Sequence, residues 1–226
     1  GGVNAITPAI AVQVNDMISI GAAYNIYFGR YDFEETDELY DFEPVDFSGA
    51  SFDLGLVVKR NDQFSIGANL NFPYKLKEKI DDLDYEYEIE VPFFFSVGAA
   101  FKATDQLTLA FDYHSRTWSN SNIFEDADFD TDLNSIHAGL EYLMTSGDSV
   151  IPLRLGFYTH PTHSWDYNDD QVVNSVFTLG AGLVMGNLIF DGAFEFEPAS
   201  IEYGDGFSID QNNFRITLGG TFHFGN

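Results

Sequence analysis

Ionisable side chains recur at every second position in several segments, which is the spacing that places side chains on one face of a β-strand. His114 and Arg116 share one such face, and Arg154, Tyr158 and His160 share another. An arginine in this setting can hold a ligand carboxylate through two parallel hydrogen bonds. We therefore expect Arg116, His114, Arg154, Tyr158 and His160 to be candidate ligand contacts, and Arg116 is the first candidate for a carboxylate contact.

The same pattern has a plainer interpretation as a structural network. Charged groups that face one another across a sheet pair with each other and stiffen the fold without touching a ligand. The wider set with this spacing comprises Asp53, Lys59, Asp112, His114, Arg116, His137, Glu141, Arg154, His160, Asp191, Glu195, Arg215 and His223. The sequence leaves both interpretations available for each of these residues.

Catalytic and metal-binding motifs are weak in this chain. Asp112 and His114 lie on one predicted face, but no serine stands in a G-x-S-x-G motif beside them, so we expect no enzyme. A metal ion needs three or four converging ligands, and His160 and His163 supply two. Cysteine is absent. We therefore expect no catalytic residue, no metal site in the strands and no cofactor.

Two acidic segments are the exception to this expectation. The segment from Asp32 to Asp46 carries eight acidic residues and no basic one, and a second segment carries Glu125, Asp126, Asp128, Asp130 and Asp132. Alternate carboxylates can bind Ca²⁺ through oxygen. The glycine and terminal glutamate of an EF-hand loop are missing, so Ca²⁺ on these loops is a minor alternative to plain solvation.

Composition excludes several classes of protein. The 226 residues carry a net charge of −26, yet 45% are hydrophobic and 16% are aromatic. A disordered acidic chain would lack that aromatic content. Nucleic-acid binding needs the opposite sign of charge. No run of eighteen apolar residues is present, so we expect no transmembrane helix.

Alternation with a period of two dominates the chain and predicts β-strands. The segment LTLAFDY at residues 107–113 and the segment FRITLGGTF at residues 214–222 are clear examples. We expect eleven strands, near residues 7–14, 17–28, 52–60, 63–76, 85–103, 107–119, 134–144, 152–161, 174–185, 188–197 and 212–224.

The connections between these strands alternate in length. The short ones carry Asn, Asp, Gly and Ser and lie at 15–16, 61–62, 103–106, 145–149 and 186–187. The long ones lie at 29–51, 77–84, 120–133, 162–173 and 198–211. Short turns at one end and long loops at the other are typical of bacterial outer-membrane β-barrels. A soluble β-sandwich with an inward apolar face is the alternative.

The direction of the strands predicts that part of the barrel precedes residue 1. Strands of these barrels are even in number and both ends face the periplasm. The last predicted strand follows a long loop and runs towards the periplasm. Counting back, the first predicted strand starts at the extracellular side, so an odd number of strands is expected before it. We predict a single barrel domain over residues 1–226 whose N-terminal strands lie outside this sequence.

Several motifs resemble the outer-membrane hydrophobic-compound transporter family, typified by the long-chain fatty acid transporter and including the toluene transporters. They are TPAIAV at 7–12, MISIGA at 17–22, IGANLNFP at 66–73, VPFFFSVGAAF at 91–101, LTLAFDY at 107–113, LRLGFY at 153–158 and FTLGAG at 177–182. The resemblance implies a fourteen-stranded antiparallel transmembrane β-barrel, of which about eleven strands are in this sequence, with an N-terminal hatch. The hatch motif is not among these residues.

This resemblance implies passive uptake of hydrophobic small molecules, such as fatty acids or aromatic hydrocarbons, across the bacterial outer membrane. Its partners would be outer-membrane lipid and a hydrophobic ligand, and not nucleic acid. The alternative is an outer-membrane barrel that acts as a surface scaffold or shuttle, with a partner protein at the extracellular loops. An apolar space connected through the barrel would favour transport.

Overall fold

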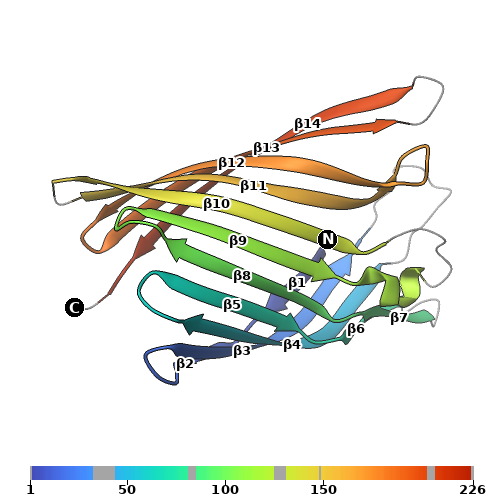
Figure 1. Ribbon diagram of the computed structural model, residues 1–226. Coiled ribbons are helices and arrows are strands. Elements are labelled where there is room, and N and C mark those ends of the chain that lie inside the picture. Colours follow the sequence, from blue (N-terminus) through green and yellow to red (C-terminus); the bar gives the residue numbers. More distant parts are fainter. Residues whose placement is uncertain are drawn as a thin grey trace. The chain divides into compact units, whose positions relative to one another are not determined.

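The computed structural model describes residues 2–32, 44–80, 85–124, 131–147, 149–202 and 207–224. These residues form fourteen β-strands and two short 3-10 helices (Figure 1). The strands are β1 (Gly2–Ile6), β2 (Ala9–Gln13), β3 (Ile18–Tyr31), β4 (Val45–Lys59), β5 (Phe64–Asn71), β6 (Tyr74–Ile80), β7 (Tyr85–Val91), β8 (Phe94–Lys102), β9 (Leu107–Arg116), β10 (Leu133–Ser146), β11 (Ser149–Trp165), β12 (Gln171–Met185), β13 (Leu188–Glu202) and β14 (Ser208–Phe222). The helices are Trp118–Asn120 and Asn122–Phe124.

The strands belong to one sheet, in the order β1-β3-β4-β5-β8-β9-β10-β11-β12-β13-β14. Pairs such as β10–β11 and β13–β14 are antiparallel. Each crossing of the sheet by the chain from one end to the other is called a pass here, and neighbours along this path belong to consecutive passes. The path holds eleven strands, which is the number that the alternation predicts. The all-β antiparallel class is confirmed.

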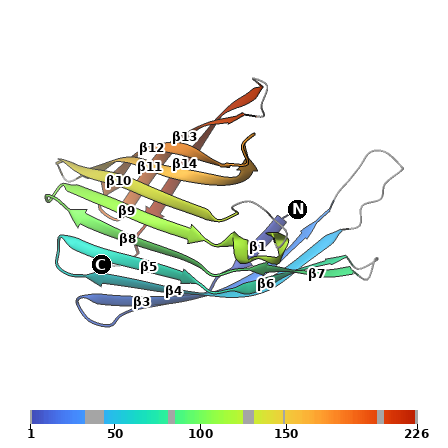
Figure 2. The same ribbon diagram turned by 45° about the vertical axis from the view of Figure 1, so that its right-hand side comes forward.

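Prolines divide three of the eleven passes, which is why fourteen strands are observed. Pro8 separates β1 from β2, both of which pair with β3. Pro73 separates β5 from β6, and Pro92 separates β7 from β8. Proline has no N–H to donate to the ladder, so the pairing stops at each of these residues. Between Pro73 and Pro92 the chain forms a ribbon of β6 and β7, in which β6 also pairs with the first part of β4 (Figure 2).

Three of the short connections are turns that one polar side chain closes. The Oδ1 atom of Asn15 accepts hydrogen bonds from the N–H groups of residues 17 and 18, and Asn61 does the same for residues 63 and 64. The Oγ1 atom of Thr104 takes this role at 104–107. Gly147 and Gly186 adopt the left-handed region, at φ of 59° and 55°. The turn chemistry predicted for these positions is confirmed.

The strands extend further than predicted at the end of the sheet that lies opposite the short turns. β11 has 17 residues and continues to Trp165, and β4 has 15 residues and begins at Val45. The connections predicted at 162–173 and 29–51 are correspondingly shorter. Crossing a bilayer takes only about 9–11 residues of a tilted strand. Backbone pairing therefore continues past the segment in which apolar alternation is needed, and the sequence pattern ends before the strand does.

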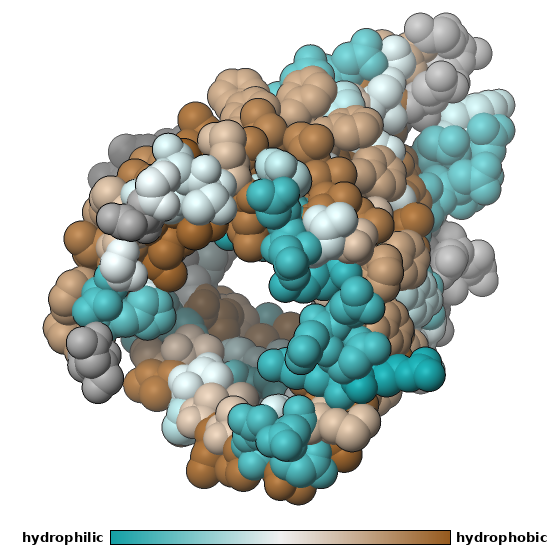
Figure 3. Space-filling model, turned by 60° about the vertical axis from the view of Figure 1, so that its left-hand side comes forward, coloured by the Kyte–Doolittle hydropathy of each residue, from teal (hydrophilic) through white to brown (hydrophobic). Residues whose placement is uncertain are grey.

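Exposure along the strands is the reverse of that in a soluble protein. On β12, Phe177 and Leu179 expose 52% and 58% of their surface, while Thr178 between them is half-buried. Across the described ranges, Val91 and Val176 are the buried apolar residues. A soluble sandwich would bury a whole apolar face between two sheets, so that alternative is contradicted. Hydrophobic side chains make up much of the surface seen in Figure 3, and no helix of the described segments is long and apolar enough to cross a bilayer.

The chain divides into two compact units. The first unit comprises residues 1–58, 68–96 and 115–132. The second unit comprises residues 59–67, 97–114 and 133–226. Both contain alternating strands with one apolar and one polar face.

Candidate functional site

The strand register of the second unit brings charged side chains onto one face of the sheet. Glu141 of β10 lies opposite Arg154 of β11, and Arg154 lies opposite Gly180 of β12. Residues that are directly opposed share a face. Gly182 lies opposite Asp191 of β13, and a Cβ atom on Gly182 would lie 2.6 Å from Oδ1 of that carboxylate. The missing side chain therefore makes room for a charged residue on the next strand.

Arg154 is held by two carboxylates from different strands. Its Nε atom lies 2.7 Å from Oε2 of Glu141, and its Nη1 atom lies 2.6 Å from Oδ1 of Asp191. The three side chains remain between 34% and 43% exposed, so they form a network at an accessible surface. Two edges of the guanidinium are used for pairs within the protein, which is the structural role that the sequence left as an alternative.

The remaining acids of this face also have partners. Arg215 of β14 donates from Nε to Oε2 of Glu195 at 2.7 Å. Glu197 lies 2.7 Å from Nδ1 of His160 and accepts a hydrogen bond of 2.8 Å from Nδ2 of Asn174. His160, predicted as a ligand contact, is thus engaged by a carboxylate.

His114 and Tyr158, two other predicted ligand contacts, are brought together through His137. The ring of His137 lies parallel to that of Tyr158, with centroids 4.9 Å apart and an interplanar angle of 8°. The ring of His114 lies 4.4 Å from that of His137. Ser135 lies within hydrogen-bond distance of Nε2 of His137, at 3.1 Å. These rings form an aromatic row on the polar face of β9, β10 and β11.

Arg116 belongs to the first unit, whereas the other four predicted contacts belong to the second. It ends β9, is exposed and forms no ion pair with the residues that the structure describes. The role of all five residues as ligand contacts stays a prediction.

The first unit contains a polar network that sequence reasoning largely missed. Nδ2 of Asn25 donates to Oγ of Ser51 at 2.9 Å and to Oδ2 of Asp53 at 2.8 Å. Nδ2 of Asn71 donates to the other oxygen of Asp53 at 2.8 Å, and Asn69 donates to Asn71 at 3.1 Å. Of these residues, only Asp53 is among the ionisable side chains that the sequence analysis placed on polar strand faces. The alternation of Asn69 and Asn71 on one strand face was the available signal.

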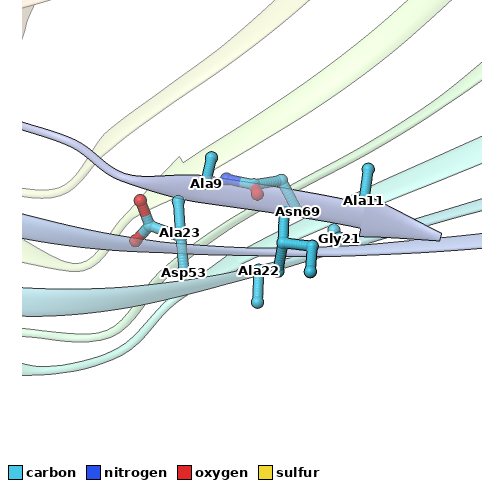
Figure 4. Close-up of a pocket in the computed structure, with 9 residues that line it drawn as sticks. Ala9, Ala11, Gly21, Ala22, Ala23, Asp53 and Asn69 are labelled. Atoms are coloured by element: carbon cyan, nitrogen blue, oxygen red, sulfur yellow. The ribbon is translucent and has the colours of Figure 1, made fainter.

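A hollow with a volume of about 380 Å³ lies beside this network in the first unit. It is lined by Ala9, Ile10, Ala11, Gly21, Ala22, Ala23, Asp53, Gly55 and Asn69 (Figure 4). Ala9 pairs with Ala23, and Ala23 pairs with Asp53, so these three residues share the polar face. A Cβ atom on Gly55 would meet nothing within 4 Å. Small residues at facing positions therefore leave a mostly apolar space with a carboxylate and an amide at its side.

The ribbon of β6 and β7 carries a ladder of ion pairs on one face. Nζ of Lys75 lies 2.7 Å from Glu88 and 3.2 Å from Glu90, and Nζ of Lys77 lies 2.7 Å from Glu86 and 3.2 Å from Glu88. The hydrogen bonds to these glutamates raise the pKa of both lysines. The hydrogen bonds from Lys75 and Lys77 in turn lower the pKa of Glu88.

Metal ligands do not converge in the ranges that the structure covers, where no group of three or more His, Asp or Glu side chains is placed to hold a metal ion. Most of the acidic segments at 32–46 and 125–132 lies outside the described residues. The alternative of Ca²⁺ on those loops stays a prediction.

Comparison with solved structures shows which known proteins share this fold. A homologue of FadL from Pseudomonas aeruginosa aligns over 99% of this chain and 68% of its own, with a TM-score of 0.62 and 16% identity. The toluene transporter TodX from Pseudomonas putida aligns over 97% and 68%, with a TM-score of 0.61 and 13% identity. The monoaromatic hydrocarbon channel CymD aligns over 98% and 73%, with a TM-score of 0.60 and 15% identity.

No protein-family model and no curated protein sequence matches the chain. The structural similarity nevertheless extends over almost the whole chain, and it combines with an exposed apolar face that suits lipid. The predicted location in the bacterial outer membrane agrees with this architecture. The chain has the antiparallel transmembrane β-barrel fold of the outer-membrane hydrophobic-compound transporters, the family that its sequence resembles.

Proposed function

We propose that the chain forms part of an outer-membrane channel for the passive uptake of hydrophobic small molecules. In a transmembrane barrel the apolar face of each strand meets lipid and the polar face lines the interior. The hollow lined by Ala9, Ala23 and Gly55 is on that interior side. Its position makes it a place where a molecule crossing the barrel would rest.

The size and lining of the hollow are the observation that carries the proposal. Its volume of about 380 Å³ falls within the range of small-molecule pockets, roughly 300–1,000 Å³. Most of its lining residues are Ala, Gly and Ile, so the transfer of an apolar guest from water to the hollow is favourable. Asp53 and Asn69 at one side are polar groups of the kind that orient a guest.

The similar structures support the same class of substrate. CymD is named as a channel for monoaromatic hydrocarbons, and TodX as a toluene transporter. Aromatic hydrocarbons are therefore the substrates to test first, beside the fatty acids that the resemblance of the sequence implies. A passive route needs no energy source, and none of the motifs in the sequence supplies one.

Uptake by intact cells tests the proposal. The full-length protein would be produced in the outer membrane of a Gram-negative host that lacks its own hydrophobic-compound channel. We expect faster uptake of radiolabelled toluene or palmityl alcohol than in cells with the empty vector. Uptake equal to that of the empty vector, with the protein folded in the membrane, would refute transport and favour the scaffold alternative.

A further inference from the structure

We infer that the polar face of β10 to β14 selects against anionic ligands, so that the channel takes up uncharged hydrophobic molecules in preference to carboxylates of the same size. This inference rests on the proposed uptake function and names the charge of its substrate. It concerns the second unit alone.

The cations of this face are few and already paired. Arg154 and Arg215 are the two Lys or Arg residues between positions 133 and 222. Arg154 is shared by Glu141 and Asp191, and Arg215 is held by Glu195. A ligand carboxylate that approached either guanidinium would meet a positive charge that carboxylates of the protein already neutralise, so it would gain less there than at an unpaired arginine.

The acids outnumber the cations on the same face. Its carboxylates are Glu141, Asp191, Glu195 and Glu197, against the two guanidinium groups of Arg154 and Arg215. The excess is two negative charges when His114, His137 and His160 of this face are neutral, and each histidine that is protonated reduces it by one. Like charges repel more strongly beside a low-dielectric wall than in open water. Rings of charged side chains select ions by sign in membrane channels on this principle.

Neutral apolar guests are not subject to this electrostatic repulsion, and they can still contact the aromatic rings of the same face. The parallel rings of His137 and Tyr158, with His114 of β9 beside them, offer an aromatic row on the same face. Stacking and apolar contact with these rings do not depend on a charge on the guest. The face therefore distinguishes an alcohol or a hydrocarbon from an acid of equal length.

The test compares two probes of equal chain length, palmityl alcohol and palmitate, in uptake by cells that carry the full-length protein. We expect the alcohol to enter faster, by about tenfold at low ionic strength, with the difference shrinking as salt is added. The double variant Glu141→Gln, Asp191→Asn removes two negative charges and releases Arg154. We expect this variant to take up palmitate faster, with the ratio of alcohol to acid falling towards one.

Asp105→Asn is the matched control, since Asp105 lies on a turn, is fully exposed and pairs with Lys102. We expect it to keep the wild-type ratio. Heat-dependent mobility in gel electrophoresis verifies that each variant is folded, and the salt series on the wild type tests the inference even if the double variant fails to fold.

The failures of the two proposals are distinguishable. Equal uptake of both probes by the wild type would overturn the inference and leave the uptake function standing. A ratio that neither salt nor the double variant changes would also overturn it, as would an equal shift in Asp105→Asn. Uptake of neither probe would refute the function itself.

Discussion

Asn71 and Asp53 are joined by a hydrogen bond of 2.8 Å between Nδ2 and Oδ1, and Asn25 binds the other oxygen of the same carboxylate. The three side chains come from β5, β4 and β3. One carboxylate thus links three consecutive passes of the sheet through two neutral amides, beside the hollow.

Asp53→Ala tests the structural part of this network. The substitution removes one of the two acceptors of the Asn25 amide, which is 9% exposed, and the acceptor of the Asn71 amide. Leaving a buried donor unpaired costs about 1–3 kcal/mol. We expect the free energy of unfolding in detergent to fall by about that amount, measured by urea titration. Asp105→Ala at an exposed turn should change it by less than about 0.5 kcal/mol; an equal loss in both would contradict the network.

The ion pairs of the β6–β7 ribbon predict a pH dependence with two limits. The pKa of Glu88 is lowered by hydrogen bonds from Lys75 and Lys77. Its contribution to the stability of the ribbon is therefore present above the ordinary pKa of a glutamate, and it is lost as the pH falls through the lowered value. The pKa values of Lys75 and Lys77 are raised, so their contribution is present below the ordinary lysine pKa and is lost as the pH rises through the raised values. We expect the ribbon to be paired most tightly between about pH 5 and pH 10.

Spin labels can measure this pH dependence, because the chain contains no cysteine and a label therefore attaches only to a cysteine that is introduced. Labels at Glu78→Cys and Tyr87→Cys lie opposite each other on the ribbon. The distribution of distances between the two labels should broaden below about pH 5, above about pH 10 and at high salt. Glu88→Gln should weaken the dependence at acid pH, and a distribution that stays constant across the series would show that the ladder does not hold the ribbon.

Asn122 closes part of the outer edge of β7. Its Oδ1 atom accepts a hydrogen bond of 2.9 Å from the N–H of Glu90, and its Nδ2 atom donates one of 2.7 Å to the carbonyl of Glu88. One side chain therefore substitutes for a neighbouring strand. We expect Asn122→Ala to reduce hydrogen-exchange protection of the Glu90 amide by about tenfold. The neighbouring change Asn120→Ala should leave that protection intact, and equal protection in both variants would contradict this role.

The strands and turns could be predicted from sequence because their signals are local. Alternation predicted eleven passes, and Asn15 and Asn61 predicted tight turns that the structure confirms. The division of passes at Pro73 and Pro92 follows from the missing N–H, but the alternation predicted undivided strands at 63–76 and 85–103.

The partners of the polar residues could not be predicted, because they depend on register. Shifting one strand by a single residue would move Arg154 to the other face and away from Glu141. The sequence therefore placed Arg154 and Glu141 on polar faces but could not pair them. Asn25 carries no charge and was not among the predicted site residues, and its role follows from its hydrogen bond to Asp53.

The hollow provides the most direct test of uptake. Gly55 lines it, and a Cβ atom there would meet nothing within 4 Å, so the side chain of Gly55→Leu would begin in open space and occupy part of the hollow. Gly220 of β14 lies opposite Phe190 on the apolar face and does not line the hollow, and a Cβ atom there would meet only the Phe190 ring, at 3.8 Å, which makes Gly220→Leu the matched control. In cells carrying the full-length protein, we predict that Gly55→Leu slows uptake of radiolabelled toluene by about fivefold or more while Gly220→Leu leaves it at the wild-type rate. Equal rates in the wild type and Gly55→Leu, with both proteins folded in the membrane, would contradict the assignment of the hollow to the transport path.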